Sequence, residues 1–204
     1  MGNFSRDGEK NIPDHRVRGD ITVITYTIPM EEERIHSERL GEELVMRDFT
    51  KDDVEAMSDL LANADKEYLG MDYAHLLEFR DPARLREVIH DVLHFYGNDR
   101  LFKGIWRGDT LIGGGVLAFE EEGQKKVASV GGIARKGYEG QGLSEHILTW
   151  AKEEVQLRPG FILEATVNVA NKYADAARRA LVEKAGFKYM GVTQGILHRF
   201  IYEF

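Results

Sequence analysis

Apolar residues recur with two different periods along the chain, and each change of period predicts where a strand gives way to a helix. Short runs rich in β-branched residues predict strands, whereas apolar residues three or four positions apart predict amphipathic helices. From residue 43 onward the predicted order is strand, two helices, three strands, helix, strand, helix and two strands. This alternation predicts an α/β domain.

The first predicted core strand, Glu43–Phe49, leads into a helix with a recognisable start. Thr50 and Asp53 have the spacing of a capping box, in which each side chain bonds the backbone N–H of the other residue. The helix then carries one apolar stripe, which consists of Val54, Met57, Leu60, Leu61 and Ala64. A second helix is predicted to begin at Asp81-Pro82, because proline suits the first helical position.

The N-terminal forty residues are predicted to stand apart from the main domain. Residues 1–20 are polar and aperiodic, which is typical of a flexible tail. Residues 21–29, ITVITYTIP, predict an added strand that is covered on both faces or pairs with a partner chain, as in a homodimer. Residues 30–40 are predicted to form a charged connector, with a helix as one interpretation. The predicted division is therefore 1–40, tail and added strand, and 41–204, main domain.

The middle of the chain predicts a hairpin followed by a glycine-rich junction. Strands at Leu101–Trp106 and Thr110–Phe119 are joined by a tight turn, and three glycines inside the second strand, Gly113 to Gly115, indicate that another backbone or a ligand comes close. The next strand, Val127–Ala134, runs into a turn that ends at Gly142, where a helix begins. Glycine has no Cβ and a helix begins with unpaired N–H groups, so this junction predicts either a phosphate cradle or a tight turn without a ligand.

The C-terminal part predicts a strand at residues 161–167, a helix at residues 171–184 and a closing hairpin at residues 187–204. The strand carries apolar residues on both faces, which is typical of the centre of a sheet. Gly186 follows the helix, in the position where glycine commonly ends one.

Two motifs of this half resemble signatures of the GCN5-related N-acetyltransferase (GNAT) family. The residues from Glu139 to Ser144 stand in the order of the family's glycine-rich signature, and EKAGF, residues 183–187, resembles the end of its last helix. The resemblance covers roughly residues 40–204 and implies a GNAT-like mixed central sheet flanked by helices, with an extra strand in front. Glu139 departs from the family's basic or amide residue, and its carboxylate would repel a pyrophosphate. Ser144 departs from a small apolar residue.

The resemblance implies transfer of an acetyl group from acetyl-coenzyme A, as co-substrate, to an amine. In the family, backbone N–H groups of the fourth strand hold the pantetheine arm and polarise the thioester carbonyl, which here implies Gly132, Ile133 and Ala134. The implied pyrophosphate site consists of Gly140, Gln141, Gly142, Leu143 and Ser144. Arg135, together with Lys136, is expected to offset the charge of Glu139 or to be solvated. Residues 68–79 are expected to line the acceptor pocket or to pack under a loop.

Proton transfer is less defined by the resemblance. The family's tyrosine acid falls on Val182, or on Arg178 if the last helix has one extra turn, so Tyr173 is the nearest substitute acid. Glu164, in an otherwise apolar strand, is the candidate base that takes the proton of the amine. Alternatively, its carboxylate forms a salt bridge with a neighbour, and water relays the proton instead. Asn168 and Asn171 are expected to contact the cofactor or to cap the helix.

Composition narrows the class of protein. The chain has 204 residues, of which 43% are hydrophobic and 30% charged, as in an ordinary globular domain. A net charge of −8 argues against nucleic acid or an anionic membrane as the main partner and suits a basic acceptor. No cysteine is present, which excludes disulfides and thiolate metal sites, and no metal site is expected. We expect a cytoplasmic protein, since neither a signal peptide nor a membrane span is evident.

Three functions are compatible with these patterns. The leading hypothesis is an N-acetyltransferase that acts on a small-molecule amine, a protein N-terminus or a lysine. The second is a catalytically degenerate GNAT-like domain that binds an acyl-coenzyme A without turnover, which Glu139 and the missing tyrosine favour. The third is an interaction module built around residues 21–29. Only the first two require the cradle.

Overall fold

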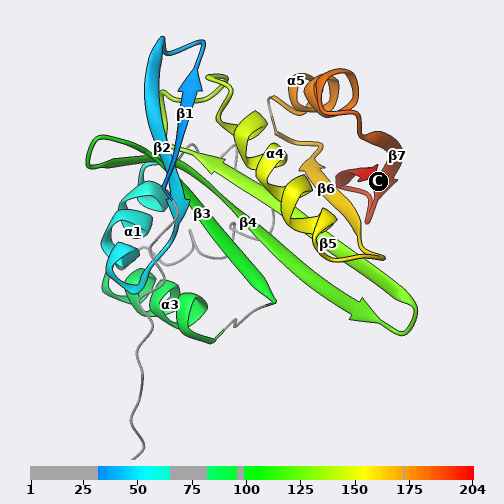
Figure 1. Cartoon of the computed structure of the whole chain (residues 1–204), viewed down its shortest axis with the longest axis horizontal. Helices are drawn as coiled ribbons and strands as arrows, with labels where there is room; N and C mark the ends of the chain where they lie inside the picture. Colours follow the sequence, from blue (N-terminus) through cyan, green and yellow to red (C-terminus); the bar gives the residue numbers. More distant parts are fainter. Residues whose placement is uncertain (1–31, 65–81, 96–98, 172) are drawn as a thin grey trace, which may run out of the picture.

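One mixed sheet organises the part of the chain that the structure describes, which is residues 32–64, 82–95, 99–171 and 173–204. In this computed structural model the sheet has eight strands in the order β1-β2-β3-β4-β5-β6-β8-β7 (Figure 1). The predicted tail, the predicted strand at residues 21–29 and the region at residues 68–79 lie outside the described residues.

The sheet changes direction once, at its centre. Strands β1 to β5 form a continuous antiparallel run, β6 pairs parallel to β5, and β8 and β7 add an antiparallel hairpin at the far edge. The strands are β1 (Glu33–Ser37), β2 (Glu42–Asp48), β3 (Arg100–Arg107), β4 (Thr110–Glu122), β5 (Lys125–Ala134), β6 (Ile162–Asn168), β7 (Lys188–Thr193) and β8 (Leu197–Tyr202). This mixed sheet, with helices on both faces, confirms the predicted fold class.

Helical segments cover both faces of the sheet (Figure 1). Those on one face are α1 (Val54–Ala62) and α3 (Pro82–Phe95), which pack against each other; those on the other are α4 (Leu143–Gln156), α5 (Ala174–Arg179) and the π-helical turn Ala180–Lys184. The main core lies between the sheet and α4, where Ile105, Leu117, Leu163 and Phe200 are fully buried beside Ile147. Helix α4 begins at Leu143, as predicted.

The segment predicted as a charged connector is instead a strand. Within residues 30–40, β1 pairs antiparallel with β2, and Ile35 and Ser37 are buried while Glu33, Arg34 and His36 are exposed. Alternation with one buried face is the strand period, which the high density of charge concealed in the sequence. Strand β1 thus adds a strand ahead of the first core strand, whereas the added strand predicted at residues 21–29 stays a prediction. The β1–β2 hairpin crosses the predicted division between residues 40 and 41.

Two of the three glycines of β4, Gly113 and Gly115, allow helix α4 to lie close to the sheet. A Cβ at Gly115 would overlap the Cγ2 methyl of Ile147, and a Cβ at Gly113 would lie 3.0 Å from Cδ1 of Leu143. On the opposite face, a Cβ at Gly114 would lie 2.9 Å from the carbonyl oxygen of Lys103. The sequence predicted a close approach at this point, and the approaching element is the first part of α4.

The start of the first helical segment is fixed to the sheet by a buried carboxylate. Asp53 accepts hydrogen bonds from the Thr50 backbone N–H at 2.7 Å and from the two Nη atoms of Arg47 at 2.8 Å each. The predicted capping box of Thr50 and Asp53 is present. Burial by itself raises the pKa of Asp53, but the hydrogen bonds from Arg47 and Thr50 outweigh it, so the pKa lies below its ordinary value.

We expect Asp53→Asn to lower the free energy of unfolding at pH 7 by about 3 kcal/mol, because Arg47 would lose its partly buried partner. The pKa of Asp53 is depressed by folding, so its stabilisation is complete above the ordinary value of 3.8 and is lost as the pH falls through the lower folded-state pKa. Urea unfolding between pH 7 and pH 2 tests this. The control is Asp52→Asn in the same turn, where the side chain is exposed. Equal losses in the two variants would contradict the prediction.

Candidate functional site

The two central strands of the sheet separate before they end. Strands β5 and β6 are paired from Val127 to Val130, after which β5 continues with β4 alone and β6 continues with β8 alone. Gly132 and Thr166 are exposed, although both lie in the middle of the sheet, where strands are ordinarily covered. The divergence therefore opens a gap at the carboxyl ends of the two parallel strands.

The register of β5 shows which of its backbone groups face this gap. Arg135 donates its backbone N–H to the Ile112 carbonyl of β4 at 2.9 Å. Because polar groups alternate in direction along an antiparallel strand, the backbone groups of Ile133 also point to β4, and those of Gly132 and Ala134 point into the gap. Two of the three residues predicted to hold a pantetheine arm thus offer free backbone groups there.

The third, Ile133, contributes its side chain to the clusters between the sheet and α1. The chain after α1 lies at the end of the gap, because Lys136 donates its N–H to the Asn63 carbonyl at 3.0 Å and Ala64 forms a β-bridge with Arg135. The described chain breaks off at residue 64 at this point. The segment that the sequence analysis associated with the acceptor, residues 68–79, lies outside the described residues.

The glycine turn has the geometry of an anion cradle. Gly137, Gly140 and Gly142 have φ angles of 92°, 70° and 85°, which only glycine adopts without strain. A Cβ at Gly140 or Gly142 would have no heavy atom within 4 Å, so the space in front of the turn is open. Among the described residues no acceptor is bonded to the N–H groups of Gly140, Gln141, Gly142, Leu143 and Ser144. These free donors lie at the positive end of the α4 dipole.

The carboxylate of Glu139 is turned back onto its own loop. Its Oε2 accepts a hydrogen bond of 2.6 Å from the N–H of Gly137, and the N–H of Tyr138 bonds the Arg135 carbonyl at 2.9 Å. The side chain thereby closes the first part of the turn, at the end away from α4. This contact provides part of the compensation that the sequence analysis sought for the negative charge of Glu139.

Arg135, predicted to offset that charge, is bound elsewhere. Its Nε donates to the Leu111 carbonyl at 3.0 Å, and its Nη2 pairs with the carboxylate of Asp59 in α1. Only 17% of the side chain is exposed, so it braces β5 against β4 and α1. Lys136 is exposed and has no ionic partner among the described residues. Of the two cations beside the turn, Lys136 is the one with an accessible ammonium.

Asn168, Asn171 and Tyr173 lie at the other side of the gap, where β6 passes into α5. The side-chain oxygen of Asn168 accepts from the Ala170 N–H at 2.9 Å, and that of Asn171 accepts from the Tyr173 N–H at 2.8 Å. Both asparagines therefore order the turn, which is the capping alternative of the sequence analysis. Tyr173 is exposed and stands directly before the first residue of α5.

The last helix ends in an irregular turn, near the two positions that the sequence analysis aligned with the family's tyrosine. Residues 180–184 form a π-helical turn, and Ala185 donates its N–H to the Ala180 carbonyl at 3.0 Å. A π turn contains one residue more than an α turn, which shifts the register of everything before it. Val182, one of the two positions aligned with the family's tyrosine, is 40% exposed in this turn. The other, Arg178, lies 3.7 Å from Asp175.

Glu164 forms an ion pair with Arg199 of the neighbouring strand β8. Its Oε2 accepts from Nε at 2.8 Å and lies 2.7 Å from Nη2, and both side chains are largely covered. The hydrogen bond to Glu164 and the charge of that carboxylate raise the pKa of Arg199 above its ordinary value. The sequence analysis gave a salt bridge as the alternative role of Glu164, and this geometry corresponds to it. The ion pair favours a role for Glu164 in joining β6 to β8.

The β1–β2 hairpin contacts the cradle, which the sequence analysis missed. Ser37 donates its hydroxyl to the Gln141 carbonyl at 3.3 Å, and the guanidinium of Arg39 donates to the Gly140 carbonyl. These partners are about a hundred residues apart in the chain. The only local signal was the alternation of buried positions in β1, which would have shown that this segment belongs to the sheet.

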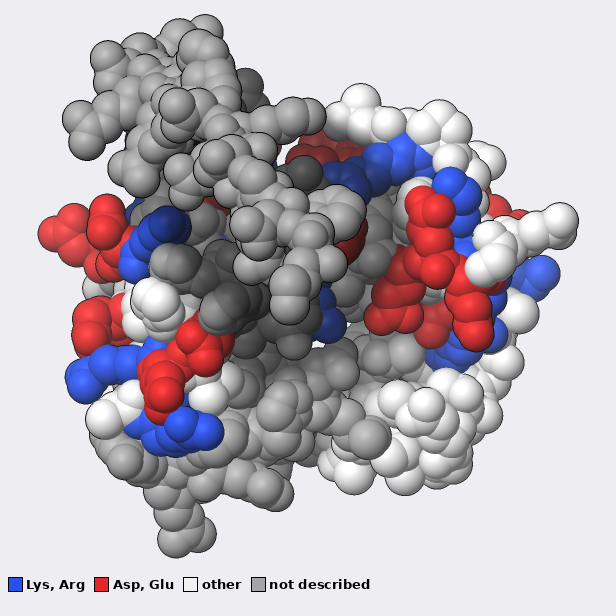
Figure 2. All heavy atoms as spheres, turned by 90° about the horizontal axis from the view of Figure 1, so that it is seen from below, with Lys and Arg blue, Asp and Glu red and all other residues white. Residues whose placement is uncertain are grey.

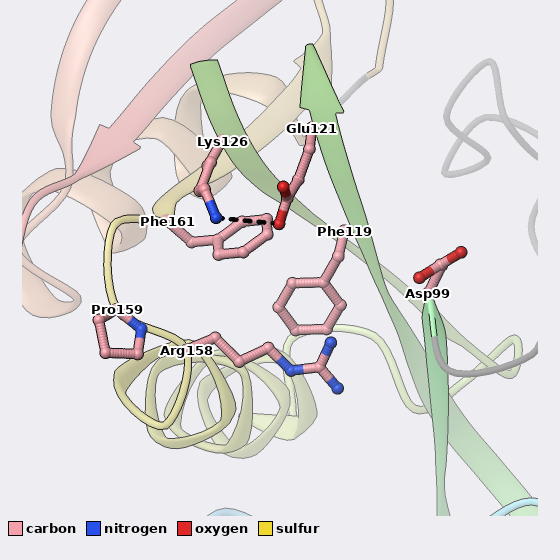
Figure 3. Close-up of a pocket in the computed structure, with 7 residues that line it drawn as sticks. All are labelled: Asp99, Phe119, Glu121, Lys126, Arg158, Pro159 and Phe161. Carbon is pink, nitrogen blue, oxygen red and sulfur yellow. Dashed lines mark hydrogen bonds and ion pairs between the residues drawn. The ribbon is translucent and has the colours of Figure 1, made fainter. Parts of the chain in front are cut away.

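A separate cavity of about 670 Å³ lies at the opposite ends of β5 and β6 (Figure 3). Its cations are paired already: Lys126 lies 3.1 Å from Glu121, and the guanidinium of Arg158 lies 3.8 Å from the centre of the Phe119 ring. Its lining consists of Asp99, Phe119, Glu121, Lys126, Arg158, Pro159 and Phe161. The near balance of charge favours no ligand class, so the candidate site is the gap and cradle.

Two searches of the described ranges, for a metal site and for a membrane-spanning helix, found neither. No group of three or more histidine, aspartate or glutamate residues is arranged there to hold a metal ion. None of the helices found there has the length and apolar composition needed to cross a membrane. Figure 2 shows acidic and basic side chains interspersed on one face of the molecule rather than gathered by sign.

Comparison with known proteins agrees with this geometry. No family model and no curated protein matches the sequence, but many solved structures match the fold. The chain resembles the GNAT domain of S. lividans PAT, with a TM-score of 0.62 and 17% identity over 85% of this chain and 97% of that one. It also resembles RimL, a ribosomal L7/L12 alpha-N-protein acetyltransferase in complex with coenzyme A, with a TM-score of 0.60 and 16% identity over 83% and 97%.

A third similar structure is the PaiA N-acetyltransferase from Thermoplasma acidophilum in complex with coenzyme A. Its TM-score is 0.54, with 17% identity over 78% of this chain and 99% of that one. Identities this low establish the fold alone. The chain has the GNAT fold, and the resemblance predicted from its two motifs is confirmed at this level.

We expect a double-mutant cycle of Glu164→Gln and Arg199→Gln to give a coupling energy of about 1–2 kcal/mol in urea unfolding, because the two groups are neighbours and largely covered. The matched control is the exposed pair of Lys126 and Glu121, for which the coupling should stay below about 0.5 kcal/mol. A coupling near zero for the first pair would show that Glu164 is not committed to Arg199, which would restore it as a candidate base.

Proposed function

We propose that the protein is an acetyl-coenzyme A-dependent N-acetyltransferase that acts on an amine, either a small molecule or a protein N-terminus or lysine. The observation that carries this proposal is one continuous feature: the gap between β5 and β6 leads to the open cradle at the start of α4. An extended ligand with amide groups along its length and a diphosphate at one end matches that feature in both shape and donors. Coenzyme A is such a ligand.

The residues fit this ligand through backbone atoms. The free N–H groups from Gly140 to Ser144 would bind the diphosphate oxygens, with Lys136 near by as a cation. Gly132 and Ala134 would pair with the amides of the pantetheine arm as an added strand would. A backbone N–H that points into the gap is also a donor for the thioester oxygen, whose negative charge grows during acyl transfer.

Two proton transfers complete the proposed reaction, in which the C–S bond of the thioester breaks as the C–N bond of the amide forms. The amine must lose a proton, and the departing sulfur must gain one. Tyr173 is the proposed acid for the sulfur, because it is exposed beside the carboxyl end of β6. Glu164 is tied to Arg199, so we propose that water takes the proton of the amine.

A domain that binds an acyl-coenzyme A without turnover is the second candidate. Two features of the chain favour it: Glu139 occupies the basic position of the family signature, and Val182 occupies a tyrosine position. It shares the cradle with the first candidate and differs only in turnover.

Calorimetric titration with acetyl-coenzyme A should show saturable binding by the wild-type chain and a loss of more than about tenfold in Gly142→Trp, whose side chain would fill the cradle and strain a left-handed position. The matched control is Gly123→Trp in the β4–β5 turn, which also has a positive φ of 60° and open space around it. No binding by the wild-type chain at millimolar ligand would overturn both candidates.

Tyr173→Phe should lower kcat by about a hundredfold while leaving the affinity for acetyl-coenzyme A unchanged, because the ring stays and only the proton donor is lost. Thiol release with a panel of amines measures turnover, and the chain contributes no cysteine background. Tyr189→Phe, at an exposed tyrosine of β7, is the control. Equal turnover in the two variants would remove Tyr173 from the mechanism, and no turnover with any amine would favour the binding domain.

A further inference from the structure

The ion pair of Glu164 and Arg199 borders the inner end of the gap. Glu164 stands one residue before Ala165, the last residue of β6 that pairs with β5. It therefore lies about 3.3 Å along the strand from the end of the pairing. Arg199 is opposite Thr166, the first residue of β6 beyond the pairing. The two side chains thus stand where the two central strands begin to separate.

The pair lies on the face of the sheet that α4 does not cover. Glu164 is in register with Ser129 of β5, and alternate residues of a strand share a face, so Glu164 is on the same face as Ile133. Ile133 packs against α1, whereas Leu163, on the opposite face, belongs to the core beneath α4. Thr166 is on the face of Glu164 and is exposed. An amine that enters the gap from this face passes the ion pair.

Part of the hydrogen-bonding capacity of the pair is unused. Both of its contacts converge on one carboxylate oxygen, because Oε2 of Glu164 lies 2.8 Å from Nε and 2.7 Å from Nη2 of Arg199. Oε1 of Glu164 and Nη1 of Arg199 have no hydrogen-bond partner among the described residues. The Glu164 side chain is 17% exposed and that of Arg199 29%. The pair therefore offers an acceptor oxygen and donor N–H groups to a molecule in solution.

This combination is complementary to an amine that has a carbonyl group next to it. An α-amino-acyl group, as in a polypeptide N-terminus or an amino acid amide, carries N–H donors and a carbonyl acceptor separated by one carbon. The ε-amine of lysine has the donors but no acceptor close by. It would leave the N–H groups of Arg199 unpaired, and a site with unpaired polar groups binds such an analogue less well. The pair has no net charge, so it distinguishes amines by their hydrogen bonds.

We propose that the Glu164–Arg199 pair selects acceptors in which a carbonyl group adjoins the amine. Oε1 of Glu164 accepts a hydrogen bond from the amine, and the guanidinium of Arg199 donates one to the carbonyl. The α-nitrogen forms the new C–N bond as the C–S bond breaks, and water takes its proton. The proposal rests on the proposed function, since it narrows the acceptor of the same reaction from any amine to an α-amine.

The test measures kcat/KM by thiol release with saturating acetyl-coenzyme A and three probes. Trialanine amide and alaninamide each carry only an α-amine, and Nα-acetyl-lysine methylamide carries only an ε-amine. The wild-type chain should prefer the α-amine probes, and the better of these two shows whether the acceptor is a polypeptide or a small amino amide. Because the free amines differ in pKa, the informative quantity is the change in this preference between the wild-type chain and a variant.

Arg199→Lys keeps the positive charge beside Glu164 but loses the guanidinium fork. It should lower kcat/KM for the α-amine probes by about tenfold, the effect of one lost hydrogen bond to a charged group, and leave that for the ε-amine probe unchanged. Glu164→Gln should lower kcat/KM for both classes, since both present an amine. The matched control is Arg86→Lys, whose Nε also lies 2.8 Å from a glutamate Oε2, that of Glu55 in α1. It should leave the preference unchanged.

The outcomes separate this proposal from the proposed function. An equal loss for both classes of probe in Arg199→Lys, at an unchanged thermal midpoint, would show that the pair only joins β6 to β8 and would overturn the proposal. A wild-type preference for the ε-amine probe overturns it whatever the stability of the variant. If the wild-type chain binds acetyl-coenzyme A but acetylates none of the probes, the proposal is overturned while cofactor binding stands. If it binds no acetyl-coenzyme A, the proposed function fails.

Discussion

The structure depends on the place where β5 and β6 stop pairing. A sheet satisfies its backbone by pairing each strand on both sides, so two central strands that separate leave polar groups that a ligand or water must satisfy. Gly132 and Ala134 on β5 are in this position, and Gly132 is exposed in the middle of an eight-stranded sheet. The glycine turn then continues β5 beyond the gap and ends at the first residue of α4. The gap and the cradle are thus consecutive parts of one strand-to-helix connection.

The surrounding contacts hold the connection from β5 to α4 in place. Helix α4 approaches β4 so closely that a Cβ at Gly115 would overlap Ile147 and one at Gly113 would contact Leu143 tightly. Arg135 ties the end of β5 to α1 and β4, and the two asparagines order the turn on the other side of the gap. The contacts of Arg135 and the two asparagines use polar side chains to fix the position of the backbone. The chemistry offered by the site is accordingly backbone chemistry.

Much of the fold follows from local patterns in the sequence. The capping box at Thr50, the start of α4 at Leu143 and the close approach at the three glycines are each determined within a few residues, so a single sequence predicts them. Strand β1 was missed because Glu33, Arg34 and His36 concealed the two inward positions. The π turn at residues 180–184 was missed because no residue pattern distinguishes it from an α turn. Contacts such as Arg39 with Gly140 depend on topology, so composition alone does not reveal them.

The chain shares its fold with structural neighbours at identities of only 14–18%. A strand edge and a helix N-terminus keep their donors whatever the side chains are, provided that glycine remains where φ is positive. Side-chain cations carry no such constraint, since an arginine from any neighbouring element can reach the same anion. Glu139 illustrates this freedom: the position that is basic or amide in the family's signature holds a carboxylate here, and that carboxylate accepts a hydrogen bond from the Gly137 N–H within the turn. The position of charge, rather than the position in the sequence, is the property that an anion site requires.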